Sequence, residues 1–194
     1  MRCARIIQSF ILCLILTGLT IAGEKNNCPD AQVELFGVSL KCADRETVWE
    51  ALKHSKVTVK SQNLQNWCDS YHSSAALQGS SELQYCYTYE DEFATARYTF
   101  PGRMDTQLVV TVRDMVANRY GQPTRSSGNT SVGQASFSWH IRDGIEIRVH
   151  RGWPDTTTYL SYIHTANNAV MERQLEQQRQ QQQQQQHERQ SDAF

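Results

Sequence analysis

The chain has 194 residues, and 19 Lys and Arg oppose 20 Asp and Glu, which leaves a net charge of −1. Proteins that bind nucleic acid through its phosphates carry a clear excess of basic residues. The charge balance therefore argues against a nucleic-acid-binding function, and we expect no nucleic acid among the partners.

The first 23 residues follow the order of a secretory signal peptide. Arg2 and Arg5 give a basic start, and an apolar run then ends at the small residues Ala22 and Gly23. The uninterrupted apolar part, 10–16, is too short to span about 30 Å of hydrocarbon. No cysteine directly follows the small residues, so a lipid anchor is not expected. Cleavage at this point lowers the basic count from 19 to 17 against 20 acidic residues, a net charge of −3. We expect a periplasmic or secreted chain with no stable membrane anchor.

The cysteines of the mature chain indicate two disulfide bonds. They are Cys28, Cys42, Cys68 and Cys86. An even number of cysteines in an exported chain is typical of disulfides, here with three possible connectivities. We favour Cys28–Cys42 and Cys68–Cys86, because each closes a short loop and the second pair would lie on neighbouring strands. No C-x-x-C spacing suggests zinc, so neither a metal nor a cofactor is expected.

The first half of the chain predicts one strand, one helix and several further strands. A strand is expected over 34–40, followed by a helix over 45–54 with Asp44 as its N-cap and Val48, Ala51 and Leu52 on one face. Alternating β-branched and aromatic residues then predict strands over 56–60, 67–72, 82–90 and 93–100.

The second half predicts the same order of elements. Asp105 is expected to open a helix that Gly121 ends, with Pro123 preventing its continuation. A loop rich in Ser, Gly and Asn follows over 126–133. A final strand is expected over 156–164.

A hairpin between these segments has a register that can be argued from burial. A two-residue turn at Asp143-Gly144 would pair Ile141 with Glu146 and bury a charge. A three-residue loop over 142–144, with Gly144 left-handed, instead pairs Ile141 with Ile145 and Trp139 with Ile147. We predict the second register, which places His140 opposite Glu146 and Ser138 opposite Arg148.

These elements predict an α+β fold, made of two tandem β-α-β-β-(β) units over about 33–100 and 97–164. Each unit would place one helix on an antiparallel sheet, within a single domain over 24–165. A tail over 166–194 follows, with seven consecutive glutamines at 180–186. Glutamine tolerates a helix and also suits a disordered polar tail, so both alternatives stay open.

Two groups of residues are candidates for function. His140, Glu146 and Arg148 would share a polar sheet face, where they could act as an acid–base or metal site, or simply form solvated cross-strand pairs. His140 and Glu146 offer two metal ligands, and the spacing places no third. Arg151 and Trp153 follow the hairpin, and their residue types suit an exposed protein-contact patch.

The chain carries no G-x-S-x-G, H-E-x-x-H or glycine-rich phosphate loop. We therefore expect a non-catalytic protein. The alternative is a small periplasmic enzyme that uses the face formed by His140, Glu146 and Arg148.

A helix that ends in Gly-x-Pro and is followed by a Trp-bearing hairpin resembles small exported bacterial proteins. The residues that carry the likeness are Val112-Arg113-Asp114-Met115-Val116, Tyr120-Gly121-Gln122-Pro123, Phe137-Ser138-Trp139 and Ile145-Glu146-Ile147. The outer-membrane assembly lipoproteins and the β-lactamase-inhibitor-protein fold look similar, although the lipid-bearing cysteine is absent here. The resemblance implies a periplasmic protein that binds another exported or envelope protein. It would act as an accessory of an envelope or secretion assembly, or as an inhibitor or immunity protein.

Overall fold

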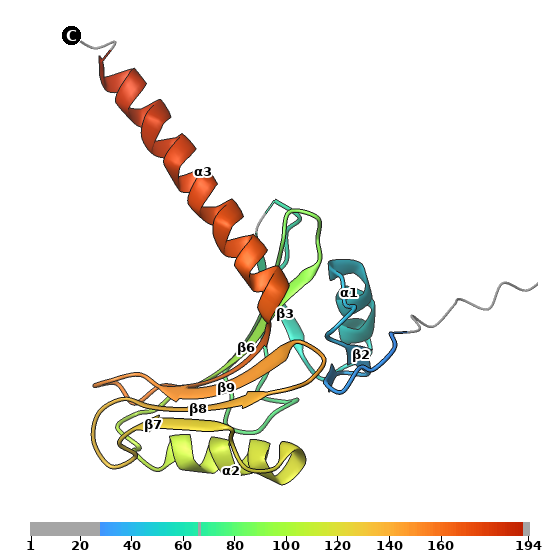
Figure 1. Ribbon diagram of the computed structural model, residues 1–194, viewed down its shortest axis with the longest axis vertical. Coiled ribbons are helices and arrows are strands. Elements are labelled where there is room, and N and C mark those ends of the chain that lie inside the picture. The colour runs from blue at the N-terminus through green and yellow to red at the C-terminus, as the bar shows by residue number, and fades with distance from the viewer. Residues whose placement is uncertain (1–27, 66, 192–194) are drawn as a thin grey trace, which may run out of the picture.

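The computed structural model describes residues 28–65 and 67–191 (Figure 1). The predicted signal peptide, 1–23, lies outside the described residues. The described chain is a mixed α+β structure, in which helices pack on an antiparallel sheet of eight strands.

The N-terminal strand predicted over 34–40 is a small hairpin instead. β1 (Glu34–Leu35) and β2 (Val38–Ser39) pair with each other, outside the main sheet. Phe36 and Gly37 have φ angles of 53° and 79°. Positive φ at both central residues is the conformation of a type I′ turn, which reverses the chain at once. The apolar alternation of this segment therefore could not distinguish one strand from two short ones.

The main sheet contains all the remaining strands that the structure describes, β3 to β10. Its order is β3-β4-β5-β6-β10-β9-β8-β7, with all neighbours antiparallel. The strands are β3 (Thr58–Ser61), β4 (Cys68–His72), β5 (Glu82–Tyr87), β6 (Phe93–Phe100), β7 (Arg125–Gly128), β8 (Ala135–His140), β9 (Ile145–Arg151) and β10 (Thr158–His164). The two halves of the chain meet where β6 pairs with β10, so the middle of the sheet is built from segments far apart in sequence.

The first two helices begin and end for different reasons. In α1 (Arg45–Lys53), the predicted N-cap is confirmed: Asp44 accepts from the backbone N–H of Thr47 at 2.8 Å, and the Thr47 hydroxyl accepts from the backbone of Asp44. α2 (Leu108–Tyr120) begins later than predicted, because Asp105 accepts from the N–H of Gln107 within a preceding turn. Gly121, with φ of 80°, follows its last turn as expected.

The loop predicted over 126–133 contains part of an edge strand. β7 pairs with β8, with Ser126 opposite Phe137, and all four of its residues are exposed. A strand held only by backbone pairing at a sheet edge needs no apolar alternation. The sequence signal on which the prediction relied is therefore missing here.

The predicted hairpin register is confirmed. Trp139 lies opposite Ile147 and His140 opposite Glu146, while the N–H of Ile141 donates to the carbonyl of Ile145 at 2.9 Å. Gly144 has the left-handed φ of 84° that the three-residue loop requires. The need to bury the apolar residues on one face thus selects between the two registers.

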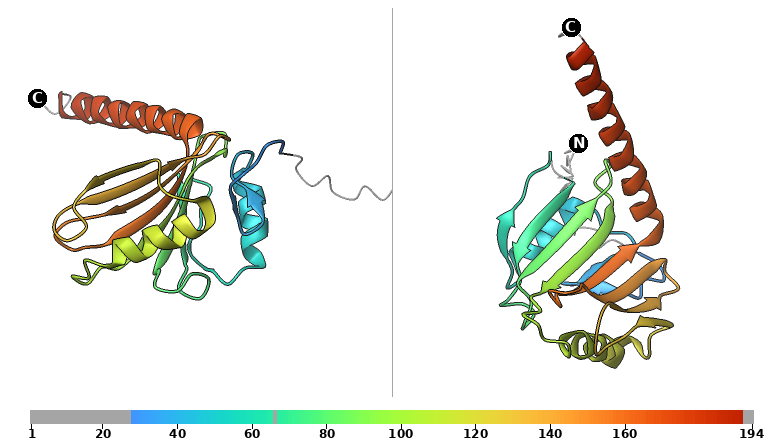
Figure 2. Two further views of the ribbon diagram at one scale, coloured as in Figure 1. Left: turned by 60° about the horizontal axis from the view of Figure 1, so that its bottom comes forward. Right: turned by 90° about the vertical axis from the view of Figure 1, so that its left-hand side faces the viewer.

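The helices α1 and α2 lie on the same side of the sheet and cover its apolar face (Figure 2). Buried side chains from both helices and from the strands form one continuous core, in which the largest include Trp139, Tyr85 and Phe93. The sheet bends so that its opposite face is concave (Figure 1). The main core therefore occupies one side of the sheet, and the other side carries only a small apolar cluster under α3.

Helix α3 (Thr165–Ser191) continues directly from β10 and includes the glutamine run. It rises from the concave side of the sheet and projects beyond the rest of the chain (Figure 1). Over 166–191, the part of the tail that the structure describes, the helical alternative is therefore the one adopted.

The two disulfide bonds join Cys28 to Cys42 and Cys68 to Cys86, the pairing that the spacing favoured. Cys68 and Cys86 are directly opposite each other on β4 and β5. The second bond lies on the concave side of the sheet, under α3.

Candidate functional site

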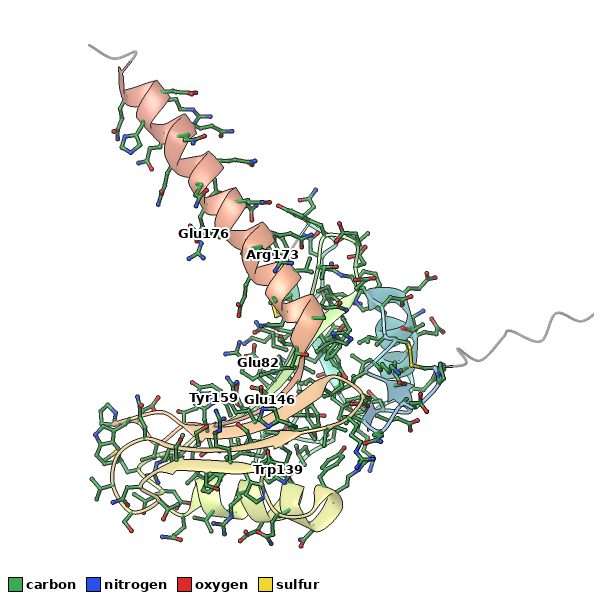
Figure 3. The ribbon with its side chains drawn as sticks, in the orientation of Figure 1. Glu82, Trp139, Glu146, Tyr159, Arg173 and Glu176 are labelled. Carbon is green, nitrogen blue, oxygen red and sulfur yellow. A yellow bond between two sulfur atoms is a disulfide. The ribbon has the colours of Figure 1, made fainter. Side chains whose placement is uncertain are left out.

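The side of the sheet that faces away from α1 and α2 is largely polar, and we call it the open face; α3 covers one end of it. It consists of the side chains of β3–β10 that alternate with the core residues. Because directly opposed residues in an antiparallel sheet point to the same side, the register defines rows that cross the strands. Figure 3 places Tyr159 and Glu146 on this side of the sheet and Trp139 on the side of α2.

The central row of the open face runs across seven strands and is polar throughout. Arginines alternate with serines in its second part. Its members are Ser70, Gln84, Arg97, Ser161, Arg148, Ser138 and Arg125. Three guanidinium groups from β6, β9 and β7 therefore follow one line across the sheet, although they come from distant parts of the sequence.

A second row, the Tyr159 row, lies beside the central row. Its members are Thr58, His72, Glu82, Thr99, Tyr159, His150, Ser136 and Ser127. The rings of His150 and Tyr159 stack with their centroids 4.8 Å apart, and the guanidinium of Arg97 lies 6.0 Å from the Tyr159 ring. A cavity of about 380 Å³ opens next to His150 and Arg148. This part of the face combines cations, an aromatic ring and a recess.

The imidazole of His150 lies in an unusual environment. Its Nδ1 is buried and has no hydrogen-bond partner among the described residues. Burial lowers the pKa of His150, and the nearby charges of Arg97 and Arg148 lower it further. His150 therefore favours its neutral form, in a place where the local field is positive.

The third row, the Glu146 row, is partly covered by α3. Its members are Cys68, Cys86, Thr95, Ile163, Glu146 and His140. Met171 of α3 packs on Cys86 and Ala94, and Leu175 packs beside it. The Trp67 indole N–H donates to the side-chain oxygen of Gln178 at 2.9 Å. Helix α3 thus covers the β4–β6 end of this row and leaves the end with Glu146 and His140 uncovered.

The predicted acid–base residues do share this face, but their contacts are with other groups. Glu146 accepts from Arg148 Nε and Nη2 at 3.0 and 2.8 Å, and His140 Nδ1 lies 3.0 Å from the hydroxyl of Thr124. No hydrogen bond joins His140 to Glu146 within the described chain. Across those same residues, no three His, Cys, Asp or Glu side chains are grouped to hold a metal ion.

The expectation that Arg151 forms an exposed contact patch is wrong. Only 1 % of Arg151 is exposed, and its guanidinium donates five hydrogen bonds of 2.7–3.0 Å to main-chain carbonyls. The accepting carbonyls belong to Thr106, Asn129, Thr130 and Gly133. Arg151 is on the core side of β9, because the alternation of the strand points its side chain inward. Trp153, in contrast, is 45 % exposed and stays a candidate for contact.

Sequence reasoning did not single out Arg97 and Tyr159. The alternation of 93–100 does place Thr95, Arg97 and Thr99 on one polar side. The pairing of β6 with β10 is what brings this side next to Tyr159 and into line with Arg148. No local pattern reveals that pairing.

Comparison with known proteins gives no family for this chain. No family model matches it, and no curated protein has a similar sequence. One solved structure is similar, that of a DUF4309 family protein (YjgB) from Bacillus subtilis subsp. subtilis str. 168, at 14 % identity and a TM-score of 0.42. The match covers 69 % of this chain and 87 % of that chain. A likeness at this TM-score carries no argument about function. None of these comparisons supports the expected resemblance to the outer-membrane assembly lipoproteins or to the β-lactamase-inhibitor-protein fold.

Among the helices that the structure describes, none has both the length and the apolar character needed to cross a membrane.

Proposed function

We propose that this chain is an exported, non-catalytic binding protein and that the open face is its contact surface for another exported or envelope protein. The observation that carries the proposal is the contrast between the two sides of the sheet. Two helices cover one side, while the other presents a line of arginines, a histidine and a tyrosine on a concave surface. Arginine and tyrosine are enriched at protein interfaces.

The proposed location rests on the sequence of the first 23 residues and on the two disulfide bonds. Disulfides persist in oxidising compartments such as the periplasm or the cell exterior. In such a compartment the chain would serve as an accessory of an envelope or secretion assembly, or as an inhibitor or immunity protein.

We propose further that the binding surface is built from two tandem units. The first would consist of α1 with β3–β6, and the second of α2 with β7–β10. Outward from the β6–β10 pair, the strands follow in reverse chain order on both sides: β6, β5, β4, β3 on one side and β10, β9, β8, β7 on the other. This symmetry supports the interpretation. A surface across the junction would then require both units.

The enzyme alternative is the less favoured of the two. Glu146 is engaged by Arg148, and His140 is hydrogen-bonded to Thr124. A general base needs a positioned partner at hydrogen-bonding distance of the proton that it takes. The contacts of these side chains are those of cross-strand pairs on a polar sheet face.

Affinity capture with charge-reversed variants tests the proposal. The full mature chain would be used as bait in extract of its native cells, next to R97E/R148E and the matched control R103E/R119E. Arg103 and Arg119 are exposed arginines outside the open face. We expect the first pair to abolish capture of the partner and the control pair to retain it. Equal capture by all three baits would exclude the open face as the contact surface.

A further inference from the structure

The charged side chains of the open face are not balanced. Its cationic residues are Lys60, Arg97, Arg125 and Arg148, and its acidic residues are Glu82 and Glu146. Lys60 pairs with Glu82, and Arg148 pairs with Glu146. Arg97 and Arg125 have no carboxylate within ion-pair distance in the described part of the chain. The face therefore has an excess of positive charge, although the whole chain has a net charge of −1.

Two cations of the central row, the unpaired Arg97 and the Glu146-paired Arg148, lie where a ligand would seat. Arg97 borders the stacked pair of Tyr159 and His150, and Arg148 and His150 line the cavity of about 380 Å³. The low pKa of His150 has the positive charges of Arg97 and Arg148 among its causes, which indicates a field at this point that favours an anion. Ser161 and Ser138 lie between the arginines and are buried, so the exposed polar groups of this part of the row are the arginines.

We infer that the open face binds an acidic peptide segment of its partner, with the segment's carboxylates held by the arginines of the central row. This inference rests on the proposed function and adds the chemistry of the partner. Arginine binds carboxylates through two parallel hydrogen bonds, which gives orientation as well as affinity. Arg97 and Arg148 lie on strands separated by β10, and two strand spacings place them roughly 10 Å apart.

A peptide fits this surface better than a nucleic acid does. Nucleic-acid binders contact about 6–10 phosphates and stack successive bases on several aromatic rings. The three rows offer one aromatic side chain, Tyr159, and one of its neighbours, His150, is already stacked against it. Arg97 and Arg148, the two arginines beside this recess, suit one or two carboxylates and are too few for a phosphate backbone.

Fluorescence anisotropy with a dye-labelled decaglutamate peptide tests the inference on the full mature chain. We expect saturable binding that R97Q/R148Q weakens at least tenfold. The matched pair R103Q/R119Q should change the affinity by less than twofold. Urea unfolding of each variant shows whether it retains the fold.

Three results would overturn the inference: no saturable binding of decaglutamate, equal losses in the two variant pairs, or tighter binding of a ten-nucleotide oligothymidylate. The failure of the inference can be told from failure of the proposed function. If decaglutamate does not bind while R97E/R148E still abolishes partner capture, the open face is the contact surface but its ligand is not acidic. If capture also survives R97E/R148E, the proposed function itself fails.

Discussion

Arg151 illustrates how one buried cation can organise a loop. Its guanidinium joins the turn after β7 to the segment before α2 through five hydrogen bonds to carbonyls. Hydrogen bonds to a charged group are stronger than neutral ones, and the fork of donors cannot be reproduced by an ammonium group. The residue type that suggested a protein interface thus has a structural role here.

We predict that Arg151→Lys lowers the free energy of unfolding by about 3 kcal/mol, because several buried carbonyls lose their donors. Urea unfolding measures the change. Arg148→Lys is the control, since Arg148 is exposed, and it should change stability by less than about 0.5 kcal/mol. A cost for Arg151→Lys as small as that of the control would contradict the role given to Arg151.

His150 predicts a pH dependence of stability. Its pKa is lowered in the folded chain by burial and by Arg97 and Arg148, while Tyr159 is the titratable group stacked on its ring. As the pH falls through about 6.5, the unfolded chain takes up a proton that the folded chain does not. Stability therefore decreases until the pH reaches the lowered pKa of the folded state.

We expect His150→Gln to lose less stability than the unmodified chain between pH 7 and pH 5, as measured by urea unfolding at several pH values. His140→Gln is the matched control, because His140 is exposed on the same face. Parallel stability curves for the unmodified chain and His150→Gln would show that His150 does not contribute.

At the scale of the elements, α3 has two halves in different surroundings. Its first half is attached to the sheet by the Asn167 side-chain bond to the Phe93 carbonyl, by the burial of Met171 and by the Gln178 bond to Trp67. Over 179–190 the side chains are exposed, and Gln180 bonds within the helix to Glu176. Helices held by few tertiary contacts open locally at low free energy.

We predict that hydrogen exchange is slow over 167–178 and fast over 179–191. Met171→Ala removes the apolar contact with Cys86 and Ala94, so exchange in the first half should approach that of the second. Glu172→Ala, at an exposed neighbouring position, should leave the pattern unchanged. Uniform protection along the whole helix would show that the second half has contacts that this structure lacks.

The elements also show how far the sequence could predict the fold. The hairpin of β8 and β9 and the start of α1 follow from local burial and capping, and both are confirmed. The edge strand β7 and the split of β1 from β2 were missed, because backbone pairing and a type I′ turn leave little trace in apolar alternation.

The candidate site was less predictable than the fold. His140, Glu146 and Arg148 were placed on one face correctly, since they belong to one hairpin. Arg97 and Tyr159 join them only through the pairing of β6 with β10, which no local pattern encodes.

At the scale of the whole molecule, the two sides of one sheet differ in chemistry. The main core with α1 and α2 lies on one side, and the excess positive charge lies on the other. A contact that uses this charge should weaken as salt is raised, because exposed charges are screened over about 10 Å at 0.1 M ionic strength.

Site-specific photo-crosslinking in native cells shows whether the open face contacts a partner. A photoreactive amino acid would replace Gln84, which is beside Arg97 in the central row, or Met115, which is exposed on α2. The account predicts a discrete crosslinked partner from position 84 and none from position 115. A partner crosslinked from position 115 and not from position 84 would contradict it.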